Sequence, residues 1–307
     1  MKTLHLPQLK REVSRLGLGS DWFSPERKDE VFAVLDAFHA AGGNLIDTGE
    51  VYAGGKSERT LGEWVAARGN RSQVVILDKG CHHPQYPFGR EAIRESITRC
   101  LDKLQTDYLD LWAFHRDNPE EPVGPLLDTL NGEVEAGRIR AFGCSNWSTA
   151  RVAEANEYAA GRGMMGLAFA SPNVSLAIPR EPFWDGCTHA TEEDLAWHAK
   201  TGLPLVAWSS QGRGFFLDRS GPGDQSDPDV VRVYHTPDNF ERLARARKLA
   251  ADKGVTAIQI ALAYVLNLPA PTLALIGPHT VDELTSSTAA LEIALSEAEM
   301  AWLALKT

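Results

Sequence analysis

The chain has 307 residues, of which 43% are hydrophobic and 23% charged. This composition is ordinary for a globular protein and excludes the disordered, collagen-like and coiled-coil classes. The formal net charge of −10 argues against a surface for nucleic acid or for an anionic membrane, because both need clustered lysine and arginine. We therefore expect neither nucleic acid nor a membrane as a partner.

Signals for export are missing. Segment 1–13 lacks the apolar run of a signal peptide, and no stretch of 18 apolar residues could span a bilayer. Cys81, Cys100, Cys144 and Cys187 show no CxxC pair and no regular spacing, so free and mostly packed thiols are the favoured interpretation. Together these features predict a cytoplasmic protein.

Strand and helix signals alternate along the chain, after a polar segment at 2–14 that predicts a capping hairpin. Apolar runs predict strands at 15–19, 44–46, 73–77, 108–114, 139–143, 166–170, 203–208 and 272–276. Helical spacing predicts helices at 25–41, 57–68, 90–104, 123–136, 148–161, 192–200, 239–253 and 256–267, with two more after Thr280 and Ser296. A long loop is expected at 209–237.

Eight short strands, each followed by a helix, are typical of a closed parallel (β/α)8 barrel, or TIM barrel. Their continuous apolar runs are the pattern of parallel strands buried on both faces. An open doubly wound sheet is disfavoured, because Trp22 stands where a dinucleotide fingerprint would need its third glycine. We predict that residues 1–307 form a single barrel domain with extra helices and the N-terminal hairpin.

In such a barrel, functional groups lie where the strands end. Asp47 ends the second strand, Tyr52 follows five residues later, Lys79 ends the third strand and His115 the fourth. Lys79 follows an apolar run and needs a counter-ion, which Asp47 can supply. The lysine should lower the pKa of Tyr52 from about 10, making the phenol a general acid. Each residue alone would more often be structural, but four converging by chance is much less expected.

Loop residues at the same rim are candidates for a substrate pocket. Trp22 and Trp147 would suit an apolar or sugar-like substrate. Residues 81–83 could be imagined as zinc ligands, but three adjacent residues rarely bend onto one metal ion, and we predict no metal site. We therefore interpret His82 as part of a polar loop that lines the substrate pocket. The insertion 178–191 is long for a loop and is interpreted as a lid. The predicted substrate residues are Trp22, Tyr52, His82, His115 and Trp147.

The motifs at these strand ends resemble those of the aldo-keto reductase family. DTGEVYAGGKSE at 47–58 resembles the signature D-T-A-x-x-Y-x-x-G-x-S-E, and LDKG at 77–80 resembles the lysine segment. DLWAFHRD at 110–117 resembles the histidine strand, and GCSNW at 143–147 the G-x-S-N-F/W segment. The resemblance covers nearly the whole chain. It implies a catalytic tetrad of Asp47, Tyr52, Lys79 and His115 and a nicotinamide cofactor, NADP(H) or NAD(H), across the barrel mouth.

The implied reaction is the reduction of a small-molecule carbonyl, in an aldehyde, a ketone or a sugar-like compound, or the reverse oxidation of an alcohol. Hydride would pass from the nicotinamide to the carbonyl carbon. Tyr52 would deliver the proton while His115 polarises the carbonyl oxygen. The same residues would oxidise an alcohol with Tyr52 as the base.

The resemblance also implies cofactor contacts. The nicotinamide carboxamide should be reached by Ser145, Asn146 and Ser171, of which Ser171 stands in place of the usual glutamine. Trp208 should stack on the nicotinamide ring, and segment 211–229 should enclose the cofactor. The expected cofactor residues are Ser145, Asn146, Ser171, Trp208, Ser209, Ser210, Gly212, Gly214, Gly277, His279, Thr280 and Glu283.

The last strand departs from the family pattern G-x-R-[ST]. His279 stands in place of the arginine that would grip an adenosine 2′-phosphate, and Glu283 would repel phosphate or hold ribose hydroxyls. The helix N-terminus with Thr280 could still bind the phosphate. We therefore expect NADPH and NADH to be about equally acceptable.

Two other function classes are weighed. A non-catalytic, cofactor-sensing subunit on the same fold is disfavoured by the intact tetrad. A metal-dependent hydrolase could use Asp47 and His115 as ligands, but the strand ends lack the clustered histidines and aspartates that such sites need.

Overall fold

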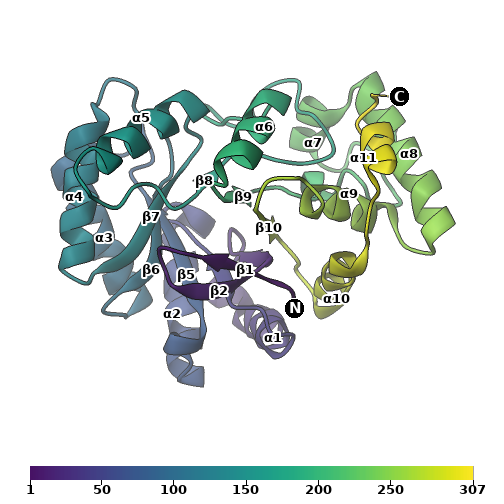
Figure 1. The fold of residues 1–307 in the computed structure, drawn as a ribbon. Helices are drawn as coiled ribbons and strands as arrows, with labels where there is room; N and C mark the ends of the chain where they lie inside the picture. Colours follow the sequence, from purple (N-terminus) through teal and green to yellow (C-terminus); the bar gives the residue numbers. More distant parts are fainter. Residues whose placement is uncertain (307) are drawn as a thin grey trace.

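The computed structural model describes residues 1–306 and contains a closed barrel of parallel strands (Figure 1). The barrel strands are β3 (Leu16–Gly19), β4 (Leu45–Asp47), β5 (Val75–Gly80), β6 (Leu109–Phe114), β7 (Ile139–Ser145), β8 (Ala170–Ser171), β9 (Leu205–Ala207) and β10 (Thr272–Ile276). Their order is β10-β3-β4-β5-β6-β7-β8-β9, and β10 pairs with β3 to close the ring. The predicted (β/α)8 barrel is confirmed.

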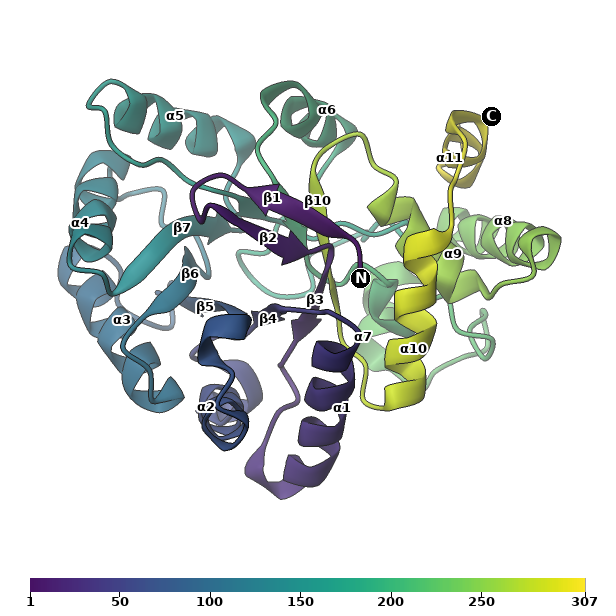
Figure 2. The same cartoon turned by 60° about the horizontal axis from the view of Figure 1, so that its bottom comes forward.

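Helices surround the strands (Figure 2). They are α1 (Lys28–Ala40), α2 (Ser57–Arg68), α3 (Arg90–Leu104), α4 (Val123–Glu135), α5 (Thr149–Ala160), α6 (Glu192–Thr201), α7 (Pro228–Tyr234), α8 (Pro237–Lys253), α9 (Ala257–Leu266), α10 (Val281–Ala289) and α11 (Glu297–Leu303). Short 3-10 turns are η1 (Pro25–Arg27), η2 (Tyr52–Gly55), η3 (Arg71–Gln73), η4 (Gly212–Gly214) and η5 (Ala290–Glu292). A buried layer that includes Trp64, Trp112 and Phe142 packs these helices onto the outer face of the sheet.

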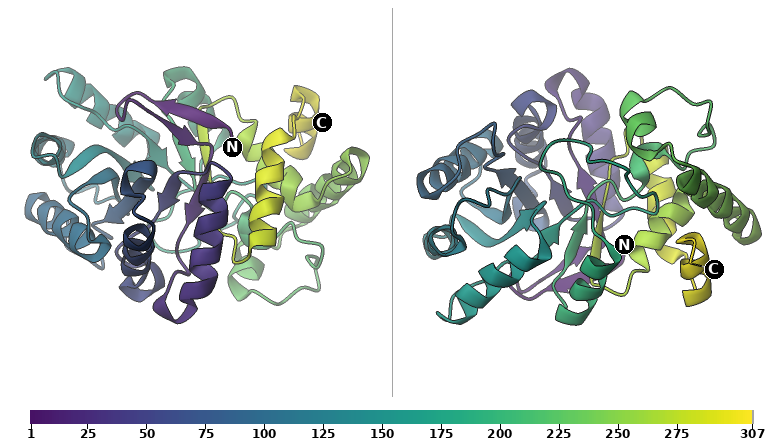
Figure 3. Two further views of the ribbon diagram at one scale, coloured as in Figure 1. Left: turned by 90° about the horizontal axis from the view of Figure 1, so that it is seen from below. Right: turned by 90° about the horizontal axis from the view of Figure 1, so that it is seen from above.

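The N-terminal hairpin of β1 (Thr3–Leu6) and β2 (Arg11–Ser14) covers the amino ends of the strands (Figure 3, left). The backbone N–H of Ser14 donates to the side chain of Asn44, the residue just before β4. Leu6 and Val13 are buried with the side chains that fill the barrel interior, such as Val75. The hairpin thus closes one end, and the other end is left to carry the site.

Two predictions about local structure are wrong. The sixth strand is Ala170–Ser171 rather than 166–170, because Leu167 donates its N–H to the side chain of Asn156 and Pro172 has no N–H to continue the ladder. The loop at 209–237 is interrupted by α7. Asp227 accepts N–H groups at the start of α7 and Pro228 occupies its first position, a helix-start signal visible in the sequence.

Within residues 1–306, no single helix has both the length and the apolar run needed to cross a membrane. Helices α8 and α9 pass this test only together, as a pair bent by 97°. The cytoplasmic location stays a prediction.

Candidate active site

The four residues predicted for catalysis meet at the carboxyl ends of β4, β5 and β6. Strand pairing brings Asp47 opposite Leu77, two residues before Lys79, and the N–H of His115 donates to the carbonyl of Gly80 at 2.8 Å. Side chains alternate along a strand, so Asp47 and Lys79 both point into the barrel, where they are 2% exposed. The register of neighbouring strands therefore assembles the cluster.

Lys79 is the centre of this cluster. Its Nζ forms an ion pair with the Asp47 carboxylate and donates to the Tyr52 hydroxyl at 3.1 Å and to the Thr48 carbonyl at 3.3 Å. Burial lowers the pKa of Lys79, but the attraction of Asp47 and Tyr52 outweighs burial and leaves this pKa raised. The ammonium is thus held charged inside the protein.

Tyr52 begins the short turn η2, in which Ala53 has a left-handed φ of 48°. The pKa of Tyr52 is raised to about 12, chiefly by burial. The positive charge of Lys79 lowers this pKa, whereas the negative charge of Asp47 raises it further. The prediction that Lys79 leaves Tyr52 with a lowered pKa is therefore wrong: the lysine acts in the expected direction, but burial is the larger effect. Tyr52 keeps its proton at neutral pH, as a general acid must.

His115 lies beside Tyr52, with ring centroids 5.4 Å apart. Burial, together with the positive charges of Lys79 and Arg116, holds the pKa of His115 well below its usual range. The ring is consequently neutral and can donate one hydrogen bond without carrying a charge. His82, a predicted substrate residue, lies next to it with centroids 4.7 Å apart.

The two predicted substrate tryptophans lie in different surroundings. Trp22 contacts His279 with their rings tilted by 34° and their centroids 4.8 Å apart, and Arg27 lies 4.5 Å from the centroid of the Trp22 ring. Trp22 therefore adjoins the predicted cofactor residues after β10. Trp147 is 5% exposed and stacks on Phe114 at 5.1 Å, within the core. Neither lies against the His82–His115 pair by any ring contact within residues 1–306.

Three predicted cofactor residues lie at the ends of β7 and β8. Asn146, in a left-handed conformation with φ of 64°, donates to the Ser145 hydroxyl at 3.0 Å and to the His115 carbonyl at 3.2 Å. Ser171 is fully buried and donates to the Val206 carbonyl at 2.7 Å. These contacts tie the end of β7 to the backbone of His115, while the Ser171 hydroxyl is already engaged within the sheet.

The segment after β9 is a tight turn in which Gly212 donates its N–H to the Ser209 carbonyl at 2.8 Å and Gly214 to the Gln211 carbonyl at 3.3 Å. Ser209, Gly212, Arg213 and Gly214 all have left-handed φ angles between 50° and 84°, and such turns can direct N–H groups toward one point. The Nε atom of Arg213 is buried and has no hydrogen-bond partner within the described chain. A positive side chain and a tight glycine turn together fit the phosphates of a dinucleotide. Ser210, by contrast, is fully buried and donates to the Leu275 carbonyl.

The segment after β10 is arranged around Glu283. Thr280 accepts the N–H of Glu283 at 3.2 Å and so caps α10, while the Glu283 carboxylate accepts the N–H of His279 at 2.7 Å. Gly277 has open space beside its backbone, where a side chain would meet no atom within 4 Å. The protein's own carboxylate therefore occupies part of the helix N-terminus.

The predicted lid, 178–191, covers the barrel beside Trp208. A cavity of about 190 Å³ lies between them and is lined by Phe183, Thr188 and Trp208, among others. Trp184 is exposed and its ring centroid lies 6.3 Å from that of Trp208, the residue predicted to stack on nicotinamide. The insertion thus contributes aromatic surface to this side of the mouth.

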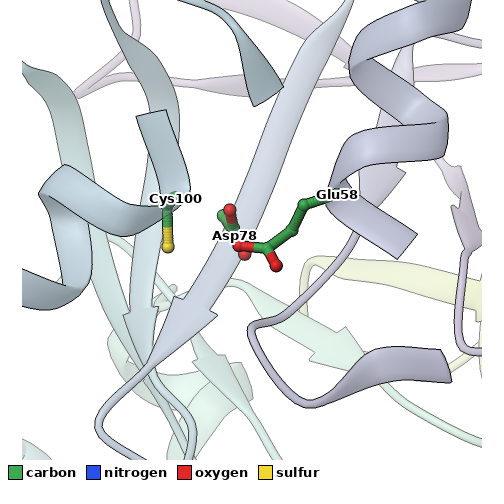
Figure 4. Close-up of side chains that lie close together, drawn as sticks. All are labelled: Glu58, Asp78 and Cys100. Atoms are coloured by element: carbon green, nitrogen blue, oxygen red, sulfur yellow. The ribbon is translucent and has the colours of Figure 1, made fainter. Parts of the chain in front are cut away.

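A buried cluster that sequence reasoning missed lies behind Lys79, between β5, α2 and α3. Glu58, Asp78 and Cys100 bring their ligand-type atoms within 4.8 Å of one another (Figure 4). Lys103 donates to Glu58 at 2.6 Å, and Asp78 accepts the N–H of Lys79 at 2.8 Å. Asp78 follows Leu77 in the strand and so points outward, away from the mouth. The ammonium of Lys103 offsets part of the negative charge of the cluster.

The model of the aldo/keto reductase family matches residues 15–305. Norsolorinic acid reductase stcV of Emericella nidulans is 32% identical over 286 residues, which cover 89% of this chain and 70% of the relative. Aldo-keto reductase ausK of the same organism is 27% identical over 314 residues, with 95% and 76% covered.

Solved structures of aldo-keto reductases are also similar to this chain. An aldo/keto reductase from Klebsiella pneumoniae, in complex with NADP and acetate, is 26% identical and superposes with a TM-score of 0.76, covering 98% of this chain and 94% of the other. A thermostable aldo-keto reductase in complex with the inhibitor epalrestat reaches 0.77 at 26% identity, with both chains fully covered.

Proposed function

We propose a specific reaction for this chain, which belongs to the aldo/keto reductase family and is an NAD(P)(H)-dependent oxidoreductase. In this proposal it reduces the carbonyl group of a small aldehyde, ketone or sugar-like compound, with Tyr52 as the proton donor. One observation carries the proposal. The Tyr52 hydroxyl keeps its proton, lies 3.1 Å from the Lys79 ammonium and has the neutral His115 ring beside it.

Each residue of the cluster has a distinct role in this proposal. The nicotinamide cofactor supplies the hydride when bound. Tyr52 holds the proton that the carbonyl oxygen receives, and Lys79 stabilises the phenolate that remains. Asp47 keeps Lys79 charged and fixed in place, and His115 donates a hydrogen bond to the carbonyl oxygen. In the reverse direction Tyr52 accepts the proton of an alcohol.

We propose that the residues after β7, β9 and β10 hold the cofactor. The left-handed φ angles in the turn at 209–214 and the half-buried Arg213, whose Nε atom has no partner within residues 1–306, support phosphate binding there. The flat indole of Trp208 at the end of β9 supports stacking on the nicotinamide. Ser145 and Asn146, joined to the His115 carbonyl, support placement of the carboxamide next to the catalytic cluster.

The test is oxidation of NADPH and NADH, followed by absorbance, across a panel of aldehydes, ketones and oxidised sugars. Tyr52→Phe is the matched variant, because it removes only the hydroxyl. Turnover by the wild type with loss in the variant supports the proposal. Full activity in the variant would remove Tyr52 as the donor, and cofactor binding without any turnover would favour a cofactor-sensing protein.

A further inference from the structure

We propose that His82 and His115 together bind two oxygen atoms of one substrate, so that the preferred substrate is a carbonyl compound with a hydroxyl or oxo group on the adjacent carbon or the next one. This inference rests on the proposed reduction at Tyr52. It goes further by assigning the substrate class, and by giving His82 the second of the two oxygens.

His82 and His115 lie side by side, just after the ends of the neighbouring strands β5 and β6. Their ring centroids are 4.7 Å apart and the ring planes are nearly perpendicular, at 78°. His115 follows β6 directly, and His82 follows Cys81, whose left-handed φ of 54° turns the chain after β5. Because Gly80 pairs with Phe114 in the barrel, the spacing of the two rings is set by the sheet.

Within residues 1–306, neither the His82 ring nor the His115 ring is hydrogen-bonded to another residue, and the Nδ1 atom of each ring is buried without a partner. A buried N–H without a partner costs on the order of 1–3 kcal/mol, which favours the tautomer with its proton on Nε2 in each ring. Each ring can present Nε2 toward a ligand, and the tautomer with its proton on Nε2 offers a donor. A substrate with two acceptor oxygens would engage both rings.

The surrounding charge favours oxygens that carry negative charge. Arg116 is 4% exposed; it donates to the carbonyls of His115 and Asp185 at 2.8 and 3.1 Å and forms no ion pair within residues 1–306. Its charge and that of Lys79 therefore act on the space between the rings. Burial and Arg116 also lower the pKa of His82, which keeps this ring neutral. The enolate or phenolate oxygen of a substrate with an enol or phenol next to its carbonyl would carry such charge and accept a hydrogen bond from a neutral ring.

The test compares 2-hydroxybenzaldehyde with benzaldehyde and 4-hydroxybenzaldehyde, which lack the neighbouring oxygen. We expect wild-type kcat/KM to be highest for the 2-hydroxy compound. The variant His82→Phe keeps an aromatic ring without nitrogen atoms, and it should lose about tenfold more activity on the 2-hydroxy compound than on benzaldehyde, as expected for one hydrogen bond. His82→Gln should recover part of this difference. His83→Phe is the control, since His83 packs on Phe88 and should not change the ratio.

Equal losses on all three aldehydes in His82→Phe, or a wild type that does not prefer the 2-hydroxy compound, would overturn the inference. Binding of 2-hydroxyacetophenone and acetophenone to the protein with NADP+, measured by calorimetry, separates it from the proposed function. If no carbonyl is reduced but 2-hydroxyacetophenone still binds about tenfold more tightly in a His82-dependent way, the proposed function fails and this inference stands. Binding that does not depend on His82 overturns the inference.

Discussion

The Nζ atom of Lys79 lies 3.1 Å from the hydroxyl oxygen of Tyr52, a residue 27 positions away in the chain. Lys79 is buried and Tyr52 is half-buried, and the lysine also forms an ion pair with Asp47. The Lys79 ammonium can therefore stabilise the phenolate that remains once Tyr52 has transferred its proton.

Removing the Tyr52 hydroxyl should abolish most of the reduction. We expect Tyr52→Phe to lower kcat by about 10²–10⁴-fold, the usual contribution of a general acid, with little effect on folding. The measurement is steady-state oxidation of NADPH with an aldehyde that the wild type reduces. Cofactor affinity, from quenching of tryptophan fluorescence, is the control and should stay within about threefold.

Removing the Lys79 charge should destabilise the protein. The variant Lys79→Met leaves the Asp47 carboxylate buried without a partner, at a cost of about 3–5 kcal/mol in the free energy of unfolding. The double variant Lys79→Met with Asp47→Asn should recover part of this loss, because no unpaired charge remains. Urea unfolding of the two single variants and the double variant measures the coupling. Losses that simply add would show that the two residues do not interact.

The pH dependence of reduction should be flat where Tyr52 stays protonated. Its pKa is raised to about 12, mainly by burial, so the protonated acid persists through neutral and mildly alkaline pH. Single-turnover reduction should therefore not fall between about pH 6 and about pH 10 through ionisation of Tyr52. Alcohol oxidation needs the phenolate and should rise over the same range. A reduction rate that falls tenfold for each unit of rising pH, starting below about pH 9, would contradict this assignment.

Asp78 should make the protein less stable as pH rises. Burial, with repulsion from Glu58, raises the pKa of Asp78 well above its ordinary value, so the folded protein binds a proton that the unfolded chain releases. The stabilisation is complete below the unfolded pKa of about 4 and is lost as pH rises through the folded value. We expect Asp78→Asn to be more stable than the wild type at about pH 8, by roughly 1–2 kcal/mol, and no more stable at about pH 4.

Asp110 offers the control for this experiment. It is equally buried but is paired with Arg71, which donates to its carboxylate at 2.8 Å. Asp110→Asn should therefore destabilise the protein at both pH values, in urea unfolding measured alongside Asp78→Asn. Stabilisation of the protein by Asp110→Asn at the higher pH would mean that burial alone, and not the absence of a cationic side chain paired with it, explains the behaviour of Asp78.

Cofactor preference should shift when His279 is replaced. The Glu283 carboxylate accepts the His279 N–H at 2.7 Å, so the start of α10 already holds a negative group. His279→Arg adds a forked cation and should improve NADPH affinity relative to NADH by about tenfold. Fluorescence titration of both cofactors measures the ratio. Glu283→Gln should move it in the same direction, and an unchanged ratio in both variants would place the 2′-phosphate elsewhere.

Local pattern was sufficient to predict the barrel and the positions of Asp47, Lys79 and His115 at its rim. Each strand is a short apolar run, and parallel strands in a barrel end on one face, so residues at strand ends converge whatever their distance in sequence. The same pattern misjudged Ala170–Ser171 and α7, where a proline and a capping aspartate override apolar periodicity.

Packing across the barrel settles the properties that depend on depth and on neighbours from other strands. The pKa of Tyr52 is raised because burial outweighs a single lysine, and no sequence spacing reveals how deep a phenol lies. The pairing of His82 with His115 and the contact of Trp22 with His279 likewise come from side chains brought together by strand register and loop turns. Residue types and strand ends are local information, whereas desolvation and side-chain contacts arise from the closed barrel as a whole.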